Sequence, residues 1–94
     1  MPTFTVAIRG HKFRSLEAQE VAKNLNAHDP VIIVPEPTNK YDPNALQIWA
    51  QDRFMGYVQK DLAAVIAPLI EGEAEAYASE EFAPDGLRFI EVTV

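Results

Sequence analysis

The chain of 94 residues has no cysteine, only four glycines and a single tryptophan. Without cysteine it can form no disulfide framework, thiolate nucleophile or cysteine-ligated zinc site. No apolar run approaches the roughly 20 residues that a membrane-spanning helix requires. The short apolar segment at the N-terminus is interrupted by Arg9 and Lys12, which is not typical of a signal peptide. We therefore expect a cytoplasmic protein that does not enter membranes.

Residues that commonly carry catalysis are also sparse. His11 and His28 stand alone, without the spacing of a metal site. Ser15 and Ser79 lie outside any nucleophile-elbow pattern, and the glycines form no phosphate-binding loop. The sequence therefore predicts no catalytic residue, no metal ligand and no cofactor, and we expect a protein that is not an enzyme.

Charge of one sign is nearly absent from the C-terminal third. Residues 1–60 hold seven of the 8 Lys and Arg and six of the 14 Asp and Glu, whereas residues 61–94 hold Arg88 against eight acids. The formal net charge of −6 argues against a generic nucleic-acid binder, which is usually basic. An acidic, solvated surface accounts for most of this pattern, and the N-terminal part remains free to hold an anion site.

The hydrophobic content of 48% is ample for a packed core, and 94 residues fit a single domain, 1–94. Alternating apolar residues predict strands, and the spacing of Leu62, Val65, Ile66 and Leu69 is helical. We expect helices over 16–26, capped by Ser15, and over 59–70, loosened by Pro68. We expect strands over 3–9, 31–34, 45–49, 54–58, 74–82 and 87–94. The order β-α-β-β-β-α-β-β predicts a mainly β protein with two helices, a small antiparallel barrel whose open ends the helices cover.

The segment VPEPTNKYDPNAL, residues 34–46, carries the most unusual chemistry. Asn39 and Asp42 can bond their own backbone and fix a turn, and the prolines lower the entropy lost on ordering. One interpretation is a rigid connection with Tyr41 lying over the core. The other is a binding loop, because Tyr41, Asp42 and Lys40 offer a stacking face, an acceptor and a cation together. Small barrels hold single-stranded nucleic acid with aromatic faces beside cations, and Lys12-Phe13-Arg14 repeats that combination.

Four segments in order resemble the HIRAN domain, a small module found in fork-remodelling translocases and, as a stand-alone type, in bacteria and phages. They cover residues 6–70, and the most specific is the E-P-x-N-x-Y-D-x-N-A pattern followed by G-Y-V. The segments are GHKF at 10–13, VPEP leading into NKYDPNAL at 34–46, GYV at 56–58, and LA through APL at 62–69.

The resemblance implies an OB-like barrel that captures the 3′ end of single-stranded DNA during DNA processing or repair, together with a nuclease or helicase-type protein. It implies that Phe13 and Tyr41 stack on bases and that Asp42 accepts a hydrogen bond from a free 3′-hydroxyl. The complete set of DNA-binding residues expected on this basis is Lys12, Phe13, Asn39, Tyr41, Asp42, Tyr57 and Lys60. Two departures from the eukaryotic pattern, phenylalanine for tyrosine at 13 and lysine for arginine at 12, remove a hydroxyl and a planar phosphate contact.

A second hypothesis comes from the acidic C-terminal third. The same fold with an acidic face can be a protein-interaction factor, such as a phage-type inhibitor or DNA mimic that acts on a nucleic-acid enzyme. The residues of that face are Glu71, Glu73, Glu75, Glu80, Glu81 and Asp85. We favour the DNA-binding hypothesis because its motif is specific, whereas runs of charge are not.

Overall fold

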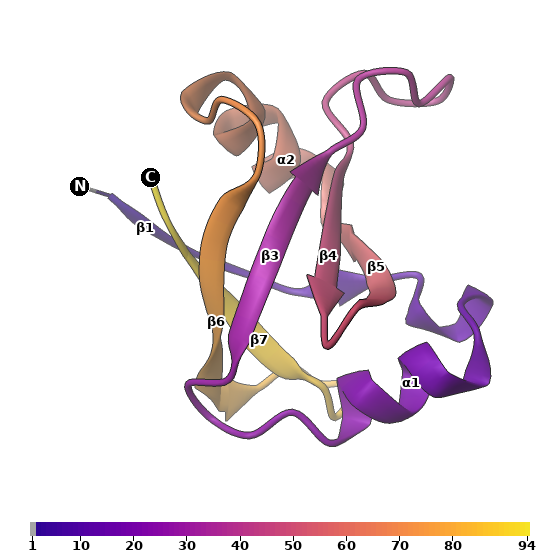
Figure 1. Ribbon diagram of the computed structural model, residues 1–94. Helices are drawn as coiled ribbons and strands as arrows, with labels where there is room; N and C mark the ends of the chain where they lie inside the picture. The colour runs from indigo at the N-terminus through magenta and orange to yellow at the C-terminus, as the bar shows by residue number, and fades with distance from the viewer. Residues whose placement is uncertain (1) are drawn as a thin grey trace.

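A computed structural model describes residues 2–94; only Met1 lies outside it. It contains a seven-stranded sheet, two α-helices and two short 3-10 helices (Figure 1). In chain order the elements are β1 (Thr3–Val6), β2 (Ile8–Arg9), η1 (His11–Phe13), α1 (Leu16–Lys23), β3 (Pro30–Pro35), β4 (Leu46–Ala50), β5 (Arg53–Val58), α2 (Lys60–Ile66), η2 (Ala67–Leu69), β6 (Ala74–Phe82) and β7 (Arg88–Thr93).

The sheet curls into a half-barrel in the order β1-β7-β6-β3-β4-β5-β2, with every pairing antiparallel. Its two edge strands, β1 and β2, are consecutive in the chain, so one segment spans the opening between β7 and β5. The single strand predicted over 3–9 is therefore interrupted at Ala7. The Ala7 amide donates to Oε1 of Gln59, and this side-chain partner takes the place of a ladder bond. The predicted OB-like antiparallel barrel with two helices is confirmed.

The inward faces of the strands form the core, which includes fully buried Ile33, Ile48 and Ile90. The two helices lie toward opposite ends of the half-barrel (Figure 1). Ser15 caps α1 as predicted, with its Oγ accepting from the Ala18 amide at 3.1 Å. The helix ends at Lys23 rather than near residue 26, because the side chain of Asn24 bonds the Glu20 carbonyl at 2.8 Å.

The second predicted helix, 59–70, is α-helical only from Lys60 to Ile66 and tightens into η2 around Pro68, where proline has no N–H to donate. Among residues 2–94, no helix combines the length and apolar character needed to cross a membrane.

The tight turn between β4 and β5 sets which side chains of the two strands lie beside each other on the outer face of the sheet. Gln51 and Asp52 both have positive φ, 50° and 60°, as in the tight hairpin turns whose twist matches that of the strands. The turn is thus complete before Arg53, which already belongs to β5. Gln47 and Tyr57 lie opposite each other across the two strands and project from the same face.

Candidate nucleic-acid interface

The loop between β3 and β4 is built by its own short polar side chains. Oδ1 of Asn39 accepts from the amides of Tyr41 at 2.9 Å and Asp42 at 3.0 Å. Oδ1 of Asp42 in turn accepts from the Asn44 amide at 2.9 Å. Such local bonds replace a regular turn and fix the backbone. The sequence prediction that Asn39 and Asp42 shape this loop is confirmed.

The carboxylate of Glu36 anchors the loop to the sheet. It accepts hydrogen bonds from Nδ2 of Asn39, Nε2 of Gln47 and the hydroxyl of Tyr57, the last at 3.1 Å to each oxygen. The bond from Asn39, more than any other contact, lowers the pKa of Glu36 below its ordinary value of 4.5. Burial, followed by the bond to Glu36, raises the pKa of Tyr57 above 10.0. Sequence reasoning gave Glu36 no role.

A pocket of about 360 Å³ opens between this loop, β5 and the start of α2. Its lining includes five of the seven residues predicted from the sequence: Asn39, Tyr41, Asp42, Tyr57 and Lys60. We call it the loop pocket. It also includes Arg9, from β2, which the sequence analysis did not select. Tyr41 is 83% exposed, so the interpretation that it lies over the core is wrong.

Two kinds of charge meet in the loop pocket. Arg9 from β2 and Lys60 at the start of α2 supply cations, and both side chains are exposed. Lys40 adds a third nearby, with its Nζ 5.5 Å from the centre of the Tyr41 ring. The one carboxylate in the lining is that of Asp42. Within residues 2–94 only its Oδ1 takes part in a hydrogen bond, which leaves Oδ2 available to a donor.

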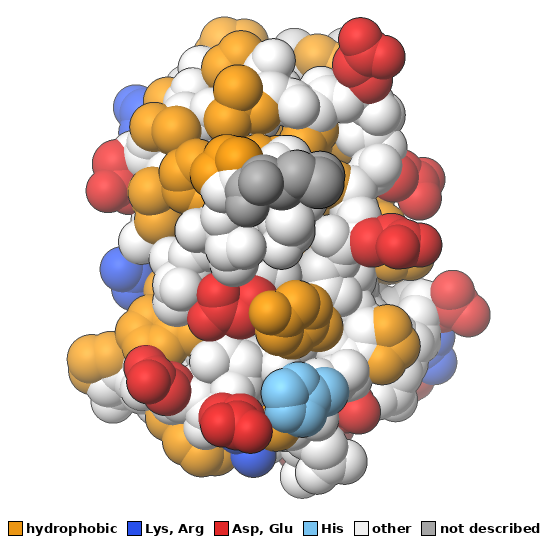
Figure 2. All heavy atoms as spheres, turned by 90° about the vertical axis from the view of Figure 1, so that its left-hand side faces the viewer, with side chains coloured by type: hydrophobic (Ala, Val, Ile, Leu, Met, Phe, Trp, Pro, Cys, Tyr) orange, Lys and Arg blue, Asp and Glu red, His pale blue; other side chains and the backbone are white. Residues whose placement is uncertain are grey.

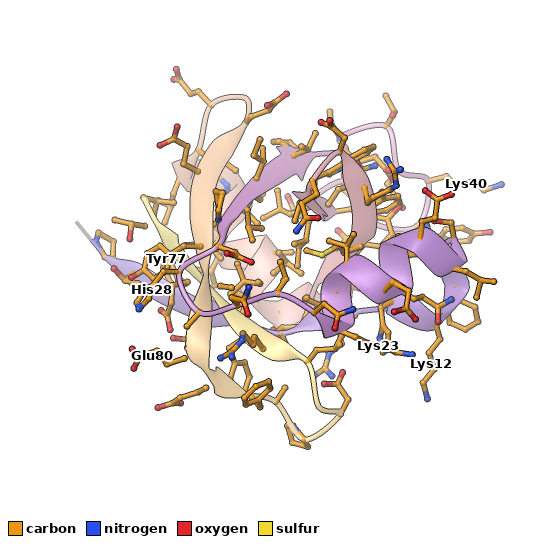
Figure 3. All side chains as sticks on the ribbon, turned by 60° about the horizontal axis from the view of Figure 1, so that its bottom comes forward. Lys12, Lys23, His28, Lys40, Tyr77 and Glu80 are labelled. Atoms are coloured by element: carbon orange, nitrogen blue, oxygen red, sulfur yellow. The ribbon has the colours of Figure 1, made fainter. Side chains whose placement is uncertain are left out.

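The other two predicted residues, Lys12 and Phe13, do not line the loop pocket. They belong to η1, which follows Gly10 in the left-handed conformation at φ 76°. Phe13 is 83% exposed, and Figure 3 shows Lys12 extending outward on the side of the molecule that also carries Lys40. The 3-10 turn thus presents a separate exposed aromatic and cation.

A row of packed side chains supports the pocket from the outer face of β4 and β5. The ring of Tyr57 meets the ring of Phe54 edge-on, with 5.2 Å between the ring centres, and Phe54 stacks on Trp49 with 5.6 Å between the ring centres. The guanidinium of Arg14 lies over Phe54, 4.5 Å from the ring centre. Sequence reasoning missed this row because it depends on the register of β4 against β5.

Three of the lysines lie on the opposite side of the molecule from Glu80. Figure 3 shows Lys12, Lys23 and Lys40 on one side and His28, Tyr77 and Glu80 on the other. The face shown in Figure 2, on which one histidine is visible, carries mainly acidic charge, with Lys and Arg toward its margins. No group of three or more His, Cys, Asp or Glu side chains suited to a metal ion occurs in the described part of the chain.

Comparisons with known proteins find one family model and two solved structures. The model of the HIRAN domain, known as a DNA-binding module, matches residues 2–90. A protein from Lactobacillus plantarum is similar with a TM-score of 0.72 and 18% identity, over 97% of this chain and 89% of that one. The HIRAN domain of human HLTF is similar with a TM-score of 0.65 and 18% identity, over 96% and 70% of the two chains. The search of curated proteins finds no match.

Proposed function

Because the chain belongs to the HIRAN domain family, we propose that it is a single module that binds single-stranded DNA and prefers strands with a free 3′-hydroxyl. The family supports DNA binding, and the preference for a 3′ end follows from the resemblance of the sequence motif. The observation that carries it is the loop pocket, in which an exposed aromatic ring, a carboxylate and two cations converge.

Stacking supplies the contact with a base. The Tyr41 ring is 83% exposed, while the backbone amide of the same residue is held by Asn39 at 2.9 Å. The hydrogen bonds fix the position of the Tyr41 backbone, so the loop itself need not be ordered when a base stacks on the ring. Stacking of one base on an aromatic side chain contributes about 1–3 kcal/mol and is tolerant of sequence.

The carboxylate of Asp42 supplies the discrimination between ends. A terminal 3′-hydroxyl can donate a hydrogen bond to Oδ2, whereas a phosphate at that position is anionic and is repelled. A hydrogen bond to a charged group contributes about 1.5–3 kcal/mol, which corresponds to at least tenfold in affinity. Arg9 and Lys60 line the same pocket, and we propose that they contact the phosphates that precede the end.

The test is fluorescence anisotropy with one thymidine strand of about ten nucleotides in three forms. The first ends in a 3′-hydroxyl, the second carries a 3′-phosphate, and the third has a 3′-hydroxyl and a 5′-phosphate. The second and third have equal charge, so repulsion by the acidic protein affects both alike. We expect the 3′-phosphate strand alone to bind at least tenfold more weakly. Equal binding of all three forms contradicts end recognition, and no binding of any contradicts the proposal as a whole.

Matched variants assign the two contacts. Tyr41→Ala should weaken binding of all three strands by about tenfold, the lower part of the range for a stacked base. Asp42→Asn keeps an acceptor but removes the charge, so it should reduce the difference in affinity between the 3′-hydroxyl strand and the 3′-phosphate strand. The control is Tyr77→Ala, which removes a tyrosine on the opposite side (Figure 3) and should change neither quantity.

In this role the chain supplies recognition and no chemistry of its own. We propose that it guides a nuclease or helicase-type protein to strand ends in DNA processing or repair, within the cytoplasm. The absence of an evident catalytic family in the comparisons supports a binding module. Co-purification of such an enzyme activity, dependent on Tyr41, is the expected result of affinity isolation from cells.

A further inference from the structure

We infer that a second concavity, on the outer face of β3 and β4, docks a segment of a partner protein that carries an apolar side chain between basic residues. The groove has a volume of about 450 Å³, and we call it the sheet groove. Its apolar lining includes Ile32, Val34 and Trp49, and its polar lining includes Asp52 and Glu73. None of these residues lines the loop pocket.

Strand register explains why apolar side chains collect there. Ile32 lies opposite Trp49 on β4 and opposite Glu75 on β6. Residues that face each other across antiparallel strands project on the same side, so the three form one row on the outer face. Ile32 is 42% exposed although it lies in the middle of the sheet. With Val34 and Trp49 it gives the groove a contiguous apolar lining, and contiguous apolar surface marks interaction sites where single exposed side chains do not.

The wall of the groove is held in place before any partner arrives. Nε1 of Trp49 donates to Oε1 of Gln47 at 2.8 Å, and its ring stacks on Phe54 at 5.6 Å with the planes 14° apart. A fixed tryptophan provides apolar area at little entropic cost, and tryptophan is enriched among the residues that dominate binding energy.

Charge selects the kind of partner. The polar groups of the lining that carry charge are both acidic, Asp52 and Glu73, and Glu75 adds a third acid beside Ile32. Arg53, which follows Asp52, is already paired with Glu17 at 2.7 Å. A polyanion such as DNA is repelled by this rim, whereas a segment with lysine or arginine is attracted.

Geometry indicates the spacing of that segment. Ile33 pairs with Ala74, the first residue of β6, so Glu73, which precedes that strand, lies beside Val34 at one end of the groove. Asp52 follows β4, which runs antiparallel to β3 (Figure 1), and so lies near Pro30 at the other end. Pro30 and Val34 are four residues apart, or about 13 Å at 3.3 Å per residue. Because the two acids also lie on opposite sides of β3, the segment must cross that strand obliquely. A basic residue two positions before and one two positions after its apolar residue then bring a long side chain toward each acid.

The partner must bind through side chains rather than by adding a strand. β3 pairs with β4 on one side and β6 on the other, so neither of its edges offers free backbone groups. Strand addition, which requires an open edge, is therefore not available at the groove.

The test uses peptides selected from a random twelve-residue display library on the immobilised wild-type chain. We expect selected peptides to carry a large apolar residue flanked by lysine or arginine. Their affinity should fall at least tenfold for Ile32→Glu, which fills the groove with a charge. The matched control is Val65→Glu, which adds the same charge at a residue of α2 that is 47% exposed and should leave affinity unchanged.

A second variant distinguishes an effect of charge on peptide binding from an effect of unfolding. Glu73→Lys combined with Glu75→Lys leaves the apolar side chains Ile32, Val34 and Trp49 unchanged and should also weaken binding of the selected peptides about tenfold. Failure to select any peptide, selection of acidic peptides, or equal binding by Ile32→Glu overturns the proposal. So does self-association of the wild type that Ile32→Glu abolishes, because a second copy then fills the groove. Binding of the thymidine strand should be the same in wild type and Ile32→Glu; a loss there assigns the groove to nucleic acid instead.

Discussion

The loop pocket and the sheet groove lie on the same curved sheet but differ in what surrounds them. Their volumes are similar, about 360 and 450 Å³, and the row Tyr57–Phe54–Trp49 connects one to the other. Arg9 and Lys60 flank the first, whereas Asp52 and Glu73 flank the second. The shared strands therefore give both sites their walls, and the segments at the strand ends give each its charge.

The two sites also differ in how their geometry is held. In the loop pocket a polar network centred on Glu36 joins Asn39, Gln47 and Tyr57. In the sheet groove, stacking and strand register position the side chains. Gln47 belongs to both arrangements, because it donates to Glu36 and accepts from Trp49. Variants that act on the shared wall should affect both sites, and variants at the ends only one.

The largest effect is expected from Gly56→Ala, in the shared wall. Gly56 has φ 153°, and an added Cβ would lie 2.4 Å from the carbonyl oxygen of Arg9. Because that contact is with backbone of β2, relief requires separation of β2 from β5. We expect the free energy of unfolding in urea to fall by about 3 kcal/mol, from overpacking and backbone strain together.

The control for this substitution is Gly86→Ala. Gly86 also has positive φ, 91°, but nothing lies within 4 Å of an added Cβ, so the cost should be only about 1–2 kcal/mol. Equal losses of stability in the two variants would show that close approach of β2 to β5 does not matter. At a temperature where Gly56→Ala is still folded, strand binding and peptide binding should both decline.

A smaller effect is expected from Glu36→Ala, which acts on the loop pocket. The substitution removes the acceptor of three hydrogen bonds, and we expect a loss of about 2 kcal/mol in the free energy of unfolding at pH 7. Because the pKa of Glu36 is lowered in the folded protein, its stabilisation is present above pH 4.5 and is lost as the pH falls through the folded pKa. The difference between wild type and variant should therefore shrink in acid.

Urea unfolding followed at several pH values measures this prediction. Glu81→Ala is the control, since the Glu81 side chain is exposed and its carboxylate makes no hydrogen bond within residues 2–94. A stability difference for Glu36→Ala that stays constant from pH 7 to below pH 4 contradicts the role given to the ionised carboxylate. Peptide binding at the sheet groove should change little, because Trp49 keeps its hydrogen bond to Gln47 and its stacking on Phe54.

The contrast between Glu36 and its loop neighbours Asn39 and Asp42 shows how much of the molecule the sequence could predict. The barrel, its helices and the order of elements follow from apolar periodicity, which is local. The turn bonds of Asn39 and Asp42 are local as well, because short polar side chains reach their own backbone. The role of Glu36 is not, since its partners Gln47 and Tyr57 lie 11 and 21 residues away.

The same distinction explains the remaining differences. The interruption at Ala7 depends on Gln59, 52 residues away, and no alternation pattern contains that contact. The sheet groove arises from the register of three strands, which places Ile32 between Trp49 and Glu75. Lys12 and Phe13 are joined to the loop in the sequence prediction by their combination of a cation and an aromatic ring and by the resemblance, and their contribution to DNA binding stays a prediction.

Two charge reversals should each lower the affinity for the ligand of one site, by about tenfold, and leave the other affinity unchanged. Lys60→Glu should weaken binding of the thymidine strand about tenfold and leave the affinity for the selected peptides unchanged. Glu73→Lys should weaken peptide binding and leave the affinity for the strand unchanged. Lys60 begins α2, where an acidic residue suits the helix dipole, so folding should not suffer. Both affinities are measured by anisotropy at one salt concentration, because phosphate contacts are screened by salt. Parallel effects of the two reversals on both ligands would mean that overall charge, and not site, decides binding.

The smallest effect is expected from Glu17→Gln, which tests the charge of the groove rim from outside it. Glu17 and Arg53 form an exposed pair with side chains 74% and 43% accessible, so the stability should change by less than about 1 kcal/mol. The released guanidinium of Arg53, whose Nη1 is already 3.4 Å from the Asp52 carbonyl oxygen, can then partly neutralise the rim. We expect the selected peptides to bind about two- to threefold more weakly and the thymidine strand to be unaffected. Unchanged or tighter peptide binding would contradict attraction by the acidic rim, because freeing a cation beside Asp52 must weaken that attraction.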